Sequence, residues 1–147
     1  MLIFKKSTFA LAAMVAVPMF AASTPAMAAG CTLATLTGTY TYAYLGYNVV
    51  KGVDVPFSVA GFASYDGKGG LKGTETETTT SATGKVVVSP GTYTGTYTIT
   101  AKCAIKEIDT QAGVLSHYDE FTGPSGNTIN FVQTDQGVVS SAIETRD

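Results

Sequence analysis

The pentapeptide TGTYT occurs twice in this chain, at residues 37–41 and again at residues 94–98. In both copies threonines alternate with larger apolar side chains, and a period of two places the two kinds on opposite faces of a β-strand. When the glycines are aligned, the apolar positions coincide: Leu36, Tyr40 and Tyr42 correspond to Tyr93, Tyr97 and Ile99. Threonine is branched yet polar and suits a β surface that faces water. The repeat therefore predicts two strands with one apolar and one threonine face, and it indicates architecture rather than chemistry.

Strand composition continues along the chain, because Thr, Val, Tyr, Phe and Ile dominate after residue 29 and helical periodicity never exceeds a turn or two. Glycine-rich breaks at residues 66–70, 123–127 and 135–137 are typical of hairpin turns. The expected strands cover residues 35–45, 53–65, 71–80, 85–89, 92–105, 114–122, 128–134 and 138–146. Short loops favour antiparallel neighbours, so we expect an all-β, up-and-down meander of about eight strands.

Such a meander can close in two ways. A barrel removes the exposed strand edges, whereas a two-sheet sandwich leaves them. Glycines inside the expected strands suit the bends of a small barrel: Gly38, Gly61, Gly73 and Gly95. We therefore predict a single antiparallel β-barrel, with a β-sandwich as the alternative. An eight-stranded barrel is either filled by side chains or holds one small ligand.

The N-terminal residues are typical of a cleaved signal peptide. Lys5 and Lys6 precede an apolar stretch at residues 9–20, and Ala26-Met27-Ala28 supplies small residues for cleavage. The apolar stretch is too short for a retained membrane anchor. We expect residues 1–28 to be removed and residues 29–147 to form one exported domain without a transmembrane segment, periplasmic or extracellular.

Export predicts an oxidising compartment, where the chain's two cysteines, Cys31 and Cys103, would form one disulfide. The bond would close a loop of about 70 residues and act as a structural staple. Acylation of Cys31 is the alternative. It is disfavoured because Ala28 stands where lipoprotein signals have a larger aliphatic residue, and because ten residues separate Phe20 from Cys31.

Charge and residue types exclude several classes of function. Without residues 1–28 the chain carries seven basic and eleven acidic residues, a net charge near −4, and has no basic cluster for nucleic acid. A single histidine, paired cysteines and scattered acids give no metal-ligand spacing. We expect no metal, no cofactor and no nucleic-acid partner.

Four stretches in this order resemble a group of small exported bacterial proteins of unknown function: GTY at residues 38–40, FASYDGKGGLKG at 62–73, YTGTYTITAKC at 93–103 and TDQGVV at 134–139. The resemblance spans nearly the whole chain after residue 28. It implies a β-barrel similar to lipocalins and allene oxide cyclases, which handle apolar molecules in the barrel. The motifs are turns, strand glycines and a cysteine, so no functional residue is carried over.

Aromatic residues on the apolar strand faces are the candidate ligand-lining groups. They are Tyr40, Tyr42, Tyr44, Tyr93, Tyr97 and Phe57. They could simply pack a core with their hydroxyls near the barrel ends. Alternatively they could line an apolar pocket in which the hydroxyls supply a few polar contacts.

His117 and Asp119 are candidate catalytic residues because they share a strand face with Leu115 and Phe121. If that face points inward, the carboxylate could orient the imidazole as a general base. No serine or cysteine nucleophile is placed by a recognisable motif. The competing interpretation, which we favour, places His117 at the rim of the barrel.

Glu75 and Glu77 share a face with Leu71 and Gly73. If that face is the core, two carboxylates enter the barrel and could perform acid–base chemistry. A bulge near Gly73 would instead turn both into solvent. The cost of burying unpaired carboxylates favours solvent.

Three functions follow from these observations. The first, which we favour, is non-enzymatic binding of a small apolar molecule in the barrel. The second is an envelope or secreted module that contacts another protein, as an inhibitor or surface component. The third is an isomerase or cyclase resembling the allene oxide cyclases, since such reactions can depend on shape and a few polar groups.

Overall fold

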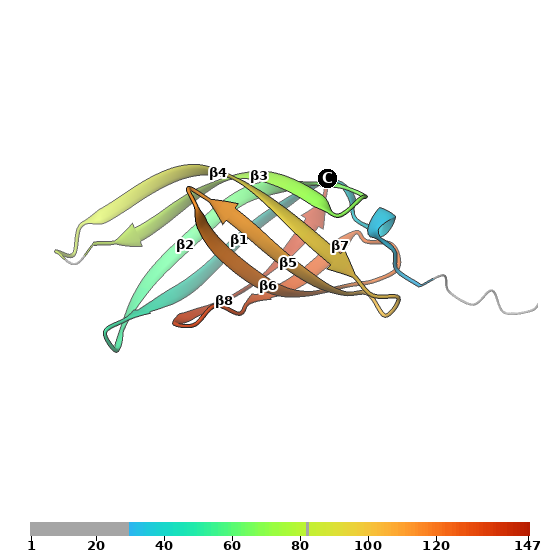
Figure 1. The fold of residues 1–147 in the computed structure, drawn as a ribbon. Coiled ribbons are helices and arrows are strands. Elements are labelled where there is room, and N and C mark those ends of the chain that lie inside the picture. Colours follow the sequence, from blue (N-terminus) through green and yellow to red (C-terminus); the bar gives the residue numbers. More distant parts are fainter. Residues whose placement is uncertain (1–29, 82) are drawn as a thin grey trace, which may run out of the picture.

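Alternating side chains along eight strands produce a closed antiparallel barrel in a computed structural model that describes residues 30–81 and 83–147 (Figure 1). The strands are β1 (Thr37–Val50), β2 (Val53–Asp66), β3 (Gly70–Thr80), β4 (Val86–Ile99), β5 (Ala104–Gln111), β6 (Val114–Thr122), β7 (Thr128–Gln133) and β8 (Val138–Arg146). Each pairs with the next, and β8 pairs with β1, with Val139 opposite Tyr47. The predicted meander barrel is confirmed, and the sandwich alternative is wrong.

The expected signal peptide, residues 1–28, lies outside the described residues. Within the described ranges, no helix has the length and apolar character needed to cross a membrane. The only helical element there is η1 (Leu33–Thr35), one short 3-10 turn ahead of β1.

The strand faces predicted for the repeated pentapeptide are the observed ones. Tyr40 and Tyr97, from the two copies of TGTYT, are 0% and 3% exposed, and both contact Tyr65 edge-on with ring centroids 5.1 and 5.3 Å apart. The neighbouring threonines lie on the outer wall. The buried apolar core consists of Leu36, Tyr40, Tyr42, Phe57, Val59, Ala63, Tyr65, Leu71, Tyr93, Tyr97, Ile105 and Ile129.

Inward-facing glycines make room for large side chains on the neighbouring strand. Gly73 lies opposite Tyr93, and a Cβ there would overlap the phenol ring. Gly95 lies opposite Asp109, and a Cβ there would overlap the carboxylate. The two glycines of the repeated pentapeptide differ, because Gly38 has a φ of +106° and no close neighbour. The glycine of the first copy thus allows a positive φ, whereas the glycine of the second copy makes room for Asp109.

The prediction was wrong about the stretch from residue 85 to residue 105. Residues 85–89 and 92–105 were expected to be two strands separated at Pro90, but β4 runs through Pro90 and ends at Ile99. Pro90 pairs with Thr76 of β3, whereas β5 pairs with β4 only from Thr94 onward, so one edge of β4 is unpaired there and tolerates proline.

The turn that separates β4 from β5 has no glycine or proline to signal it. Its residues are Thr100, Ala101, Lys102 and Cys103, and Cys103 itself adopts a φ of +65°. The strand β5, residues 104–111, was therefore missed. The first strand was also expected to end at residue 45, but β1 continues to Val50.

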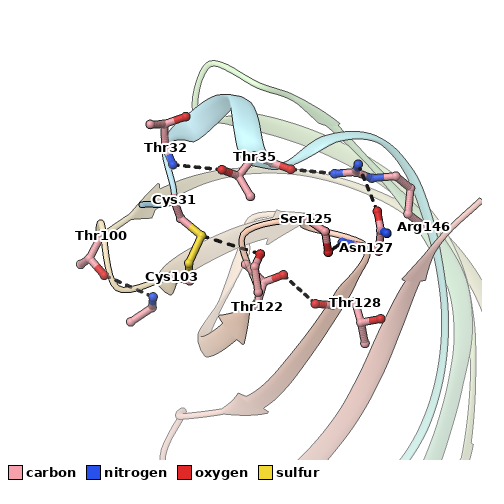
Figure 2. Close-up of a disulfide and its surroundings, with 12 residues drawn as sticks. Cys31, Thr32, Thr35, Thr100, Cys103, Thr122, Ser125, Asn127, Thr128 and Arg146 are labelled. Carbon is pink, nitrogen blue, oxygen red and sulfur yellow. Dashed lines mark hydrogen bonds between the residues drawn. A yellow bond between two sulfur atoms is a disulfide. The ribbon is translucent and has the colours of Figure 1, made fainter. Parts of the chain in front are cut away.

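One end of the barrel is covered by η1 and by the turn at residues 123–127. The Tyr97 hydroxyl lies 3.0 Å from the Leu33 carbonyl oxygen, and the Tyr40 hydroxyl donates to the Gly126 carbonyl at 2.5 Å. Arg146, near the C-terminus, donates from Nη2 to the Thr35 carbonyl at 2.6 Å (Figure 2). These bonds fix the N-terminal segment over the barrel, and we call this the covered end.

The predicted disulfide is confirmed at the covered end. Cys31 and Cys103 are bonded, with Cα atoms 5.0 Å apart, and both residues are buried (Figure 2). The bond ties the segment before η1 to the β4–β5 turn across 72 residues of sequence. With its sulfur in this bond, Cys31 has no thiol to be acylated.

We expect the Cys31→Ser/Cys103→Ser double variant to lose about 2–4 kcal/mol of unfolding free energy, because a long loop is no longer closed in the unfolded chain. Urea unfolding under non-reducing conditions measures the loss. Reducing agent should destabilise the native protein and leave the double variant unchanged. Equal urea midpoints for the oxidised native protein and the variant would contradict a stabilising bond.

Candidate functional site

Acidic side chains cluster inside the barrel, in the part of the interior away from the covered end. Six point inward: Glu75, Glu77, Glu107, Asp109, Glu120 and Glu144. The last four are buried, and Glu120 is only 1% exposed. The six acids come from β3, β5, β6 and β8, so the register of four separate strands brings them together. Burial of charge is unfavourable unless it is compensated, so the surroundings of these groups matter.

The described residues place little positive charge among these acids. The described lysines all lie in exposed positions: Lys51, Lys68, Lys72, Lys85, Lys102 and Lys106. Arg146 reaches inward only at the covered end, where its guanidinium donates hydrogen bonds to the Tyr40 hydroxyl and the Thr35 carbonyl. Within residues 30–81 and 83–147 the acids therefore have no ion-pair partner inside the barrel.

Tyrosine hydroxyl groups form some of the hydrogen bonds to these carboxyl groups. Tyr65 lies 2.8 Å from Glu107 Oε2 and 3.2 Å from Glu144 Oε2, and Tyr42 lies 3.0 Å from Glu75 Oε2. A phenol has one proton to donate, so Tyr65 can donate to only one of its two carboxyl partners at a time. The Tyr65 hydroxyl can form hydrogen bonds with both carboxyl groups at once when one of them is protonated and donates to the phenol oxygen.

Burial raises the pKa values of these carboxyl groups. It raises the pKa of Asp109 to about 7 and that of Glu144 to about 8, because the charged form loses its hydration. The pKa values of Glu107 and Glu120 lie well above the ordinary glutamate value, through burial first and neighbouring carboxylates second. At neutral pH the cluster therefore retains protons that exposed acids would have lost.

Two buried carboxyl oxygens have no hydrogen-bond partner among the described residues. They are Oδ1 of Asp109 and Oε2 of Glu120. Asp109 is 9% exposed, and its carboxylate lies against Gly95 of β4. Buried acceptors of this kind are rare in folded proteins, and each one is a position where a donor from outside the chain would be stabilising.

The barrel interior contains two adjoining spaces. An outer cavity of about 530 Å³ is lined by residues from all eight strands, among them Phe57, Glu77, Ser116 and Val138. Its lining includes Asp135 of the β7–β8 turn, so it lies at the end opposite the disulfide. We call this the open end.

The second space is an inner chamber of about 20 Å³. Its lining consists of tyrosine, phenylalanine and acidic side chains: Tyr42, Tyr44, Glu75, Tyr93, Glu107, Asp109, Tyr118, Glu120, Phe131 and Glu144. Five of these also line the outer cavity, namely Tyr44, Glu75, Tyr93, Asp109 and Tyr118. The chamber thus adjoins the outer cavity.

The aromatic residues singled out in the sequence all face the interior, but not all of them lie at a cavity. Tyr44, Tyr93 and Phe57 line the outer cavity, and Tyr42 lines the inner chamber. Tyr40 and Tyr97 instead hold the covered end through their hydroxyls. Both arrangements considered for these rings therefore occur, at opposite ends of the same barrel.

The inward-facing arrangement considered for His117 and Asp119 is wrong. Leu115 and Phe121, on the same face of β6, are 54% and 57% exposed, so this face is the outer wall. His117 Nδ1 lies 2.7 Å from Asp135 Oδ1 near the open end, and Asp119 forms an ion pair with Lys106. The inner face of β6 instead presents Tyr118 and Glu120.

The solvent-facing arrangement favoured for Glu75 and Glu77 is also wrong. The β2–β3 register runs without a bulge from Ala63–Gly73 through Gly61–Glu75 to Val59–Glu77. Both carboxylates therefore stay in phase with Leu71 and point inward. Gly61 and Gly91 are the residues paired with Glu75 on the two neighbouring strands, and a Cβ at Gly61 would crowd the Glu75 backbone and Cβ.

Four acids of the interior were missed in the sequence: Glu107, Asp109, Glu120 and Glu144. In β5 the inward positions are Ile105, Glu107 and Asp109, whereas Ile108 is 41% exposed. Alternation marks two faces but does not say which one is inside, and acids are ordinarily outside. A usable signal is the glycine opposite Asp109, but it can be read only once the register is known.

Compared by sequence, the chain matches no protein-family model and no curated protein. Two solved structures are similar in outline. A redesigned β barrel, mFAP0, bound to DFHBI has a TM-score of 0.47 and 14% identity, over 76% of this chain and 99% of that one. The S-type phycobiliprotein lyase CPES from Guillardia theta has a TM-score of 0.41 and 8% identity, over 78% and 90%. The function proposed below depends on neither similarity.

The barrel implied by the resemblance to small exported bacterial proteins is confirmed. Membership in that group stays a prediction.

The raised carboxyl pKa values predict an unusual pH dependence of stability. A group whose pKa is higher when folded binds more protons in the folded state, so unfolding free energy falls as pH rises through the interval between the two pKa values. For Asp109 and Glu144 that interval extends to pH 7–8. We expect a loss of at least ~2 kcal/mol between pH 5 and pH 8, measured by urea unfolding without ligand.

Glu120→Gln removes one of the buried titrating groups and should weaken this pH dependence, with higher stability than the native protein at pH 8. Asp119→Asn, at the neighbouring position on the outer face of β6, is the control. It removes the ion pair with Lys106 but no buried group, so its curve should run parallel to the native one, within about 1 kcal/mol. Asp66 and Asp135 have lowered pKa values, so they affect stability only at more acidic pH. A native stability that is flat from pH 5 to pH 8 would contradict the expectation.

Proposed function

We propose that this protein is a non-enzymatic binding protein that takes up one small molecule through the open end of the barrel. The observation that carries the proposal is the outer cavity, to which all eight strands contribute. Its volume of about 530 Å³ lies within the range of pockets that hold small organic ligands, roughly 300–1,000 Å³. The covered end supports uptake from the opposite side, because η1 and the disulfide lie over it.

The lining indicates a ligand that is not purely apolar. Phe57, Val59 and Val138 would provide apolar contact to a ligand. Glu75 and Asp109 lie deeper and accept hydrogen bonds. A ligand that fills the cavity therefore has an apolar body and at least one polar group. The small apolar ligand expected from the sequence accounts for the first requirement only.

The isomerase alternative retains two of its four candidate residues. Glu75 and Glu77 line the outer cavity, whereas His117 and Asp119 belong to the outer face of β6. Without an imidazole inside, the carboxylates are the only strong candidates for proton transfer among the described lining residues. Conversion of a bound molecule into an isomer, followed by chromatography, would favour catalysis over binding.

The proposed place of action is outside the cytoplasm, in the periplasm or beyond the cell. The disulfide supports this location, since such bonds persist in oxidising compartments. The N-terminal pattern of lysines, apolar residues and small residues supports it independently. The interaction-module alternative would use the outer wall, where Leu45, Tyr47 and Val139 are at least half exposed.

The binding proposal is tested with Nile red, an uncharged apolar dye whose fluorescence rises on transfer from water. We expect the native protein to bind one dye molecule. A Val138→Trp variant should bind the dye less tightly, because the larger ring fills the outer cavity. Val139→Trp is the matched control, because Val139 is 64% exposed on the other face of β8. The affinity should fall about tenfold or more for Val138→Trp only. Equal affinity for both variants would place the dye elsewhere and contradict the proposal.

A further inference from the structure

The inner chamber combines features that specify the chemistry of its occupant. It is lined by five carboxyl groups and by aromatic rings, and no described lysine or arginine lines it. Asp109 Oδ1 and Glu120 Oε2 are buried there without a hydrogen-bond partner, on side chains 9% and 1% exposed. A bound cation favours the ionised form of a carboxyl group. That form only accepts hydrogen bonds, so the partner that suits these oxygens is a positively charged donor.

We infer that the chamber binds the primary ammonium group of an organic amine whose apolar body occupies the outer cavity. The inference rests on the proposed function and names the class of ligand. An ammonium group carries three donors and a positive charge, which matches unpartnered carboxylate oxygens in charge and in hydrogen bonding. The five residues shared by the two spaces mark the passage along which the amine's chain would lie.

The size of the chamber selects a primary amine. Its volume of about 20 Å³ has room for one water-sized group, and a cavity needs at least ~10–15 Å³ to hold a water molecule. An ammonium group is of this size, whereas a trimethylammonium group is much larger. The aromatic walls also suit a cation. Tyr44, Tyr118 and Phe131 line the chamber, and aromatic rings attract a cation that lies over their faces.

A bare metal ion fits the chamber less well. Among residues 30–81 and 83–147, no three acidic, histidine or cysteine side chains converge as metal ligands would. The carboxyl groups are instead separated by phenols, with Tyr65 between Glu107 and Glu144. A cation that offers separate N–H donors to separate acceptors suits this spacing.

The test compares three probes with the same fluorescent body: dansylcadaverine, which ends in a primary ammonium group, its analogue that ends in a methyl group, and its trimethylammonium derivative. Fluorescence titration should show dansylcadaverine binding at least about tenfold more tightly than either of the others. The trimethylammonium probe separates insertion into the chamber from general attraction by negative charge.

Asp109→Asn and Glu120→Gln should each reduce the preference for dansylcadaverine by about tenfold and leave binding of the methyl analogue unchanged. Asp119→Asn removes a charge from the outer face of β6 and should leave all affinities as in the native protein. Urea unfolding confirms that each variant is folded, and the two interior substitutions replace a carboxyl group by an amide of nearly the same size.

The outcomes separate this inference from the proposed function. Equal binding of dansylcadaverine and its methyl analogue, with both blocked in Val138→Trp, would overturn the ammonium site and leave small-molecule binding intact. Equal binding of the primary and trimethylammonium probes would overturn insertion into the inner chamber. Failure of all three probes and of Nile red to bind would overturn the proposed function itself.

Discussion

The pairing of β8 with β1 is the constraint on which the other features depend. It turns a meander into a closed wall and directs alternate side chains from eight strands into one narrow interior. Space there is so limited that Tyr93 and Asp109 each lie opposite a glycine. Neighbours on adjacent strands then hold the buried carboxylates in place, and these groups cannot turn outward without breaking the sheet. The acidic interior is thus a consequence of closure as well as of sequence.

The interior changes character along the barrel axis. At the covered end, Leu36 and Ile129 are fully buried, and Arg146 and the Tyr40 hydroxyl satisfy nearby carbonyl oxygens. Further in, acids outnumber cations and two of their oxygens lack partners. The first layer stabilises the fold, whereas the second lowers its stability and would supply the chemistry of the proposed binding site. Such a division is common in proteins, because residues arranged for a ligand are rarely arranged best for packing.

The architecture could be predicted from alternation and turn residues, because a period of two and glycine-rich breaks act locally. The β4–β5 turn escaped detection because its bend at Cys103 is held by tertiary contacts rather than by a glycine. The acids of the site escaped for a different reason. Alternation in β5 and β6 is clear, but Ile108 and Phe121 face outward while Asp109 and Glu120 face inward. Which face is buried is decided by the register with neighbouring strands, a long-range property that no single segment encodes.

The disulfide between Cys31 and Cys103 has a consequence for how a ligand would enter and leave the barrel. With one end fastened, a molecule bound as proposed would have to leave by the route along which it arrived. Two molecules cannot pass each other in so narrow a space, so exchange has to proceed by departure followed by replacement. Residence time would then depend on how quickly the first occupant escapes, and raising the concentration of a competitor would not hasten its release.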